Sequence, residues 1–97
     1  MVPVAYEEIA VTAAAAVGLT EATLDSLAAN NTELAARILV CDYPIAWLEH
    51  GGTPTAATKQ QAGSGSYILL YSLAAMRKFL AIGLSSTAYL AVQYFKQ

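Results

Sequence analysis

His50 is the only histidine of the chain and its one candidate for a general base. Glu49 precedes it, but neighbouring residues on an extended strand point to opposite faces, so the two side chains would not form an acid–base dyad there. Gly51 and Gly52 follow and permit a turn, which places His50 at the edge of a loop. We therefore expect a surface or structural histidine, and an enzyme is the least favoured class of protein.

The other groups that could do chemistry lack the neighbours they would need. Ser64 and Ser66 carry no nucleophile signature, and the glycines beside them lack the lysine and following helix of a phosphate-binding loop. The 7 carboxylates are scattered without the spacing of a metal site. Cys41 stands alone in an apolar run, which excludes an intramolecular disulfide and predicts a small buried side chain. The sequence predicts no catalytic residue, no cofactor and no metal.

Composition limits the partners of this chain. Its 97 residues form one domain, 1–97, with a hydrophobic fraction of 57% and a charged fraction of 12%. That charged fraction is about half the usual share, so we expect some apolar surface to be buried against another chain. A net charge of −2 with only 5 cations and no basic cluster excludes an electrostatic footprint for nucleic acid.

The sequence also predicts neither a membrane span nor a secretory signal. A spanning helix needs about 18 uninterrupted apolar residues. The longest apolar region, residues 67–95, is interrupted by Arg77 and Lys78 and again by residues 83–87. The N-terminus has no cationic segment and carries Glu7 and Glu8 instead. We expect a protein used in the cytoplasm or built into a particle assembled there.

Short alternating runs separated by turn residues predict an all-β fold. The expected strands are residues 4–11, 37–41, 45–50, 67–71, 79–83 and 88–95, with a further extended piece at 18–20. This pattern is typical of a small β-sandwich or barrel of about six to eight short antiparallel strands. Residues 1–36 are interpreted as a strand pair or as an arm that reaches a neighbour. An all-α bundle built from the alanine-rich segments is the competing interpretation.

Three segments do not follow the strand pattern. Residues 21–29 are predicted to form a helical turn or an irregular loop. A helix would place one set of residues on a single face: Thr23, Leu24, Leu27 and Ala28. Turn residues follow at Asn30, Asn31 and Thr32. Residues 72–76 form a single helical turn before the next strand. Residues 53–66 form a long polar loop, and loops of that length are often functional.

Aromatic residues suggest two kinds of surface. The 6 tyrosines and Trp47 could form a platform that stacks on sugar rings. The favoured interpretation is packing in the core or between subunits, by the tyrosines on predicted strands: Tyr67, Tyr71, Tyr89 and Tyr94.

The central stretch, residues 44–55, carries a pattern that continues to the C-terminus. It reads Ile45-x-Trp47-x-x-x-Gly51-Gly52-x-Pro54-Thr55, then Leu73-x-x-Met76 with Phe79-x-x-Ile82, then Ala88-x-Leu90-x-Val92-x-Tyr94-Phe95. Over residues 37–95 it resembles a family of small virion proteins of tailed phages and prophages. In that family a glycine tends to follow the Pro-Thr pair within a few residues, whereas here it is delayed to Gly63, so the loop conformation is not carried over.

The resemblance implies an all-β fold and a virion role, and it supplies no catalytic residues. We expect a structural virion protein, assembled into particles in the host cytoplasm, that decorates or cements the capsid. It would act as a homo-oligomer, such as a trimer, through contacts with its own copies and with the major capsid protein or another virion protein. The alternatives are a receptor- or carbohydrate-binding module of a fibre and a neck or tail-completion protein. The expected contact residues are Tyr43, Trp47, Gly51, Gly52, Pro54, Thr55 and Tyr67.

Overall fold

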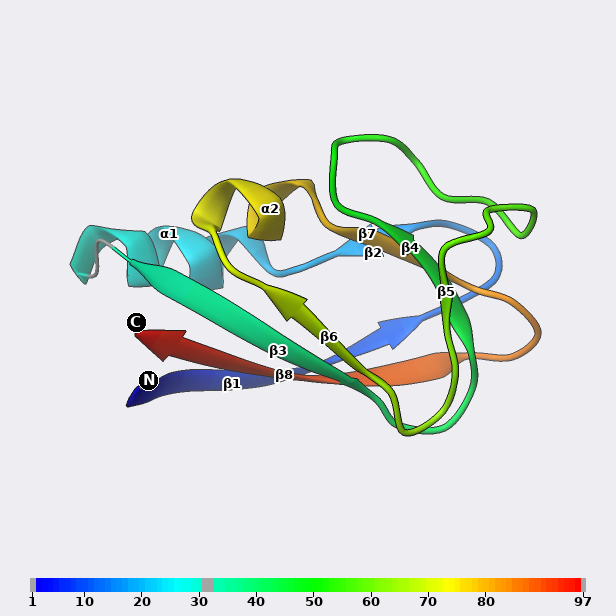
Figure 1. Ribbon diagram of the computed structural model, residues 1–97, viewed down its shortest axis with the longest axis horizontal. Helices are drawn as coiled ribbons and strands as arrows, with labels where there is room; N and C mark the ends of the chain where they lie inside the picture. Colours follow the sequence, from blue (N-terminus) through cyan, green and yellow to red (C-terminus); the bar gives the residue numbers. More distant parts are fainter. Residues whose placement is uncertain (1, 31–32, 97) are drawn as a thin grey trace.

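The computed structural model of the protein describes residues 2–30 and 33–96. Within them, eight strands form two four-stranded sheets and two short helices complete the fold (Figure 1). Every strand pairing is antiparallel. The predicted small all-β fold is confirmed, and the all-α interpretation is wrong.

The larger sheet, sheet A, joins the two ends of the chain. Its strands are β1 (Val2–Val11), β8 (Ala88–Lys96), β3 (Leu34–Val40) and β6 (Tyr67–Leu70), and they lie side by side in that order. Because β8 pairs with β1 on one side and with β3 on the other, the N- and C-termini lie next to each other (Figure 1). The first strand is thus paired within its own chain.

Sheet B is shorter. Its strands are β2 (Val17–Gly18), β7 (Leu80–Gly83), β4 (Ile45–Leu48) and β5 (Gln61–Ala62), in that order. β5 lies inside the segment that was expected to be loop throughout, and that expectation is wrong at these two residues. They pair with Ile45 and Ala46, and a pairing of two residues is too short to leave an alternating pattern in the sequence.

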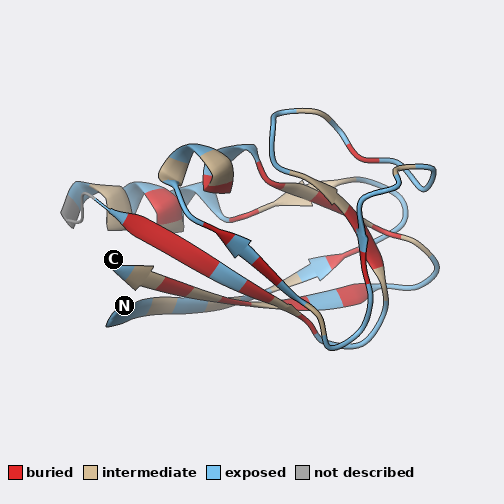
Figure 2. Ribbon diagram, viewed as in Figure 1, coloured by how far each residue is buried: buried red, intermediate tan, exposed pale blue. Residues whose placement is uncertain are grey.

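Alternation along the strands separates a core from a surface (Figure 2). On β8 the residues Ala88, Leu90, Val92 and Tyr94 are buried, as the sequence predicted. The same core cluster takes Ile38 and Val40 from β3, Ile45 and Ala81 from sheet B, and Leu24 and Met76 from the helices. Sheet B and the helices therefore cover the same face of sheet A.

Both helices are short and begin at residues suited to that position. α1 (Glu21–Asn30) buries or half-buries Thr23, Leu24, Leu27 and Ala28, so the helical interpretation of this segment and its predicted face are confirmed. α2 (Leu73–Lys78) is capped by Ser72, whose side chain accepts a hydrogen bond of 3.1 Å from the Ala75 N–H. The turn predicted at Asn31 and Thr32 lies outside the described residues.

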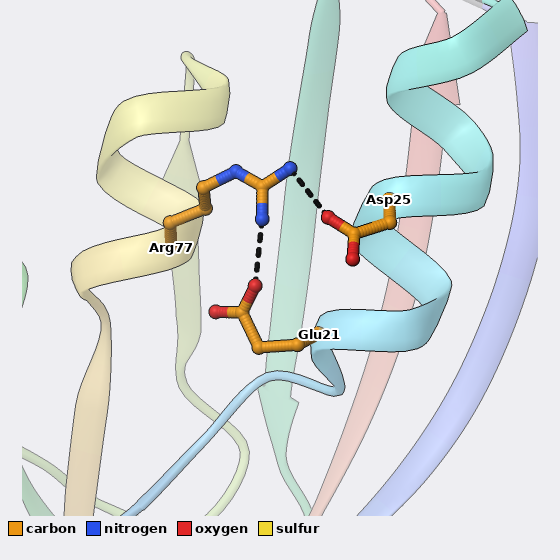
Figure 3. Close-up of polar contacts among 3 residues, drawn as sticks. All are labelled: Glu21, Asp25 and Arg77. Atoms are coloured by element: carbon orange, nitrogen blue, oxygen red, sulfur yellow. Dashed lines mark hydrogen bonds and ion pairs between the residues drawn. The ribbon is translucent and has the colours of Figure 1, made fainter.

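An exposed ion-pair cluster joins the two helices (Figure 3). The Arg77 guanidinium on α2 lies 2.6 Å from Glu21 Oε2 and 2.8 Å from Asp25 Oδ1, both on α1. Salt screens such exposed pairs, so the cluster aligns the helices more than it stabilises the fold.

A partly buried polar contact connects the two longest strands to α1. The Tyr94 hydroxyl on β8 donates a hydrogen bond of 2.5 Å to Glu7 Oε1 on β1, and the same oxygen accepts one of 3.3 Å from the Thr20 N–H before α1. Burial first, and then the hydrogen bond to Glu7 and its charge, raise the pKa of Tyr94 above its ordinary value of 10.0.

Replacing Tyr94 by Phe tests this contact. The unfolded chain ionises Tyr94 near pH 10 while the fold holds the proton, so its contribution is complete below that pH and is lost as the pH rises further. We expect Tyr94→Phe to lower the free energy of unfolding by about 1 kcal/mol at pH 7, with the difference from wild type shrinking above about pH 10. Urea unfolding between pH 7 and 11 measures it. A difference independent of pH would contradict the raised pKa.

Gly83 on β7 provides a second test, of close packing at the end of sheet B. A Cβ there would lie 2.9 Å from the Ser86 carbonyl oxygen and 3.1 Å from that of Val11, and these backbone atoms cannot move without shifting the strands. We expect Gly83→Ala to lower the free energy of unfolding by about 1–3 kcal/mol.

Gly63 is the matched control for Gly83→Ala, because nothing lies within 4 Å of a Cβ built there. Gly63→Ala should leave the urea midpoint unchanged or raise it slightly, since alanine restricts the unfolded chain. Equal midpoints for the two variants would show that the end of β7 is not closely packed.

Candidate contact surface

Within residues 2–30 and 33–96, no layer packs on one face of sheet A. α1, α2 and sheet B lie on the opposite side (Figure 1). We call this the outer face of sheet A and define it by the residues that alternate with the buried ones: Tyr6, Glu8 and Ala10 on β1, Tyr89, Ala91, Gln93 and Phe95 on β8, Arg37 and Leu39 on β3, and Tyr67 and Leu69 on β6.

Large apolar side chains stand out from this face. Tyr6, Tyr67, Leu69 and Tyr89 are each between 47% and 58% exposed, and they come from three different strands. Soluble monomers rarely expose a large contiguous apolar patch, and such patches usually mark an interaction site. The outer face of sheet A is therefore the strongest candidate for a functional surface.

The expected role of the tyrosines in the core holds for only one of them. Tyr94 is buried, whereas Tyr67, Tyr71 and Tyr89 are exposed, so packing inside the monomer is wrong for these three. For Tyr67 and Tyr89 the physical reason is the two-residue period of a strand, because both occupy positions that alternate with buried residues such as Ile68 and Leu90. Tyr71 follows the last residue of β6. Packing between subunits and stacking on a sugar both stay open for them.

Strand register places the polar residues of the face among the aromatic ones. Tyr6, Gln93, Arg37 and Leu69 form one cross-strand row, and Glu8, Ala91, Leu39 and Tyr67 form the next. Side chains in such rows are close enough to interact.

The Arg37 guanidinium rests between two aromatic rings. Its central carbon lies 5.2 Å from the centroid of Tyr67 and 5.5 Å from that of Phe95, which is the geometry of a cation–π contact. Among the described residues no carboxylate pairs with this guanidinium. Its charge is therefore presented to whatever covers the face.

Glu8 is the anion of the same face. Its Oε1 accepts a hydrogen bond of 3.1 Å from the Tyr6 hydroxyl, and within the described part of the chain no cation pairs with it. The face thus carries one cation and one anion that lack an ionic partner among the described residues.

Cys41 lies beside this face rather than in the core. It follows β3, its N–H donates a hydrogen bond of 3.0 Å to the Tyr89 carbonyl, and it is exposed. The expectation of a buried cysteine is wrong. The apolar run around it suggested burial on both faces of the strand, but only the face with Ile38 and Val40 is covered.

The contact residues expected from the sequence fall into separate places. Tyr67 lies on the outer face, and Tyr43 is exposed in the turn between β3 and β4. Trp47 is half-buried on sheet B, where its ring centroid lies 5.9 Å from that of Phe79. The structure does not bring Tyr67 and Trp47 onto one surface.

The remaining expected contact residues belong to the loop between β4 and β5, which rises on the sheet B side in Figure 1. Gly51 and Thr55 are exposed there, Gly52 is half-buried, and Pro54 is buried. Sequence reasoning did not single out Tyr6, Arg37 and Leu69, which lie on the outer face of sheet A. Their alternation with apolar residues was visible, but the strand order that makes them neighbours was not.

Within residues 2–30 and 33–96, the groups that could do chemistry do not gather into a site. His50 is exposed in the loop after β4, without a hydrogen-bonded partner in that part of the chain. The same residues contain no cluster of three or more His, Cys, Asp or Glu suited to a metal, and no pocket opens among them. None of the helices described there has the length and apolarity needed to cross a membrane.

The chain was also compared with protein-family models, with curated proteins and with solved structures, and no match was found in any of the three comparisons.

Proposed function

We propose that this protein is a structural protein of a phage particle that decorates or cements the capsid. It would act by contacts with other copies and with the shell, without chemistry. The resemblance of residues 37–95 to small virion proteins supports a place in a phage particle. The exposed aromatic side chains on the outer face of sheet A support a role that depends on contacts. That face is the single observation on which the contact role depends.

The composition of the face suits a contact surface. Interface cores are enriched in tyrosine, phenylalanine and arginine and depleted of lysine and glutamate. On the outer face of sheet A, Tyr67 and Phe95 flank Arg37, and Tyr6 and Tyr89 add two further rings from β1 and β8. Burying such side chains contributes about 25 cal/mol per Å² of apolar surface, before the entropic cost of association. A rigid sheet loses little further freedom when it binds.

A carbohydrate- or receptor-binding module of a fibre is the second candidate, favoured by the mixture of groups on this face. Tyrosine rings can stack on pyranose rings, and Arg37 and Gln93 between them can donate hydrogen bonds to hydroxyls. A neck or tail-completion protein would use the same kind of contact in a ring. The number of copies in a particle separates the decoration role from the other two.

The copy number can be measured on particles released by the cells that encode the chain. After purification on a density gradient, quantitative mass spectrometry should find the protein in numbers comparable to those of the major shell subunit. A ring or fibre component would be present in a few copies only. Absence of the protein from purified particles would contradict a virion role.

Serine variants test which surface makes the contact. Tyr67→Ser should lower incorporation into particles made without the native protein by about tenfold or more, because truncating an interface aromatic often costs about 2 kcal/mol. Tyr43→Ser is the matched control, since Tyr43 is an exposed tyrosine outside the outer face. Loss with Tyr43→Ser alone would place the contact at the turn after β3 instead.

A further inference from the structure

We infer that the outer face of sheet A packs against the same face of a second copy, with Arg37 of each copy opposite Glu8 of the other. This inference rests on the contact role proposed above and names the partner of that surface. It follows from the charges of the face, from their positions in the strand register and from the properties of the neighbouring sheet edge.

The two charges make the face complementary to itself. Arg37 and Glu8 are the only charged residues in the outer face as defined, and neither has an ionic partner among the described residues. A purely apolar partner would leave both charges buried without compensation, which is costly. A second copy supplies one carboxylate for each guanidinium, so all four charges of Arg37 and Glu8 in the two copies are paired.

Strand register allows both pairs to form at once. Glu8 and Arg37 lie two strands and one cross-strand row apart. The usual spacings of a sheet therefore place their Cα atoms roughly 12 Å from each other. The midpoint between them falls on β8, between Ala91 and Gln93. A two-fold axis that lies in the interface over this point, perpendicular to the line from Arg37 to Glu8, brings Arg37 of each copy onto Glu8 of the other. The small side chain of Ala91 near the axis permits close approach.

The size of the face predicts a weak dimer. Four strands spaced by about 4.8 Å and about seven residues long cover roughly 450 Å² in plan. The tyrosine side chains add relief, but the area is below the ~800 Å² per partner of a standard stable interface. We therefore expect association that depends strongly on protein concentration.

The open edge of β1 is a less suitable route to self-association. Pro3 has no N–H to donate, and the register with β8 shifts between Pro3 and Ala5. Proline and bulges are features that protect edge strands from pairing with another chain. A second copy is thus expected on the face of sheet A rather than at its β1 edge.

Complementary charge reversals test the inference. By sedimentation equilibrium, the native protein should pass from monomer to dimer as its concentration rises. R37E alone and E8R alone should each raise the dissociation constant at least tenfold, because each places like charges opposite one another. An equimolar mixture of R37E and E8R should regain dimerisation as a heterodimer, in which both contacts again join opposite charges.

Two further variants control for net charge. K59E and E49R change the charge as much as R37E and E8R do, but at exposed loop positions, and should dimerise like the native protein. Far-ultraviolet circular dichroism checks that each variant folds. If R37E does not fold, the dissociation constants of E8R and E49R are compared instead, and only E8R should weaken the dimer.

A native protein that stays monomeric at all concentrations, or single variants that are not restored by mixing, would overturn the inference. The virion proposal would then still be judged by the content of purified particles. Conversely, restored dimers together with particles that lack the protein would uphold the face-to-face dimer and overturn the virion role.

Discussion

The pairing of β8 with both β1 and β3 is the constraint on which the rest of the structure depends. It brings the last strand of the chain between the first strand and a central one, so sheet A is complete only when the whole chain has folded. The contact from Tyr94 to Glu7 occurs at this junction and extends it to the start of α1. Core, termini and outer face are therefore formed together rather than in independent parts.

The residues of β8 belong alternately to the core and to the outer face of sheet A. Residues of β8 that point inward fill the core, and those between them form part of the outer face. A slip of one residue in the pairing would exchange the two sets and place Gln93 in the core. Tyrosine suits the exposed positions because its ring offers apolar contact area while its hydroxyl stays hydrated.

Local pattern was sufficient for some elements and not for others. The inward residues of β8 and the buried face of α1 could be predicted, since each follows from a single period along the chain. The order of the strands could not be predicted from such a period. The cross-strand row that joins Tyr6, Arg37 and Leu69 depends on that order, so it could not be predicted either. Trp47, the only tryptophan of the sequence, was expected to be a contact residue. It lies on sheet B and packs against Phe79, away from the outer face of sheet A.

Arg77 and Arg37 differ in how the described part of the chain compensates their charge. Arg77 is met by Glu21 and Asp25 of the same chain, so its charge is compensated in the monomer. Arg37 is held in place by the rings of Tyr67 and Phe95, which orient the guanidinium without neutralising it. An arginine that is oriented but not compensated, at the centre of an aromatic face, favours a partner that brings a carboxylate. Glu8 on the same face of another copy meets that requirement.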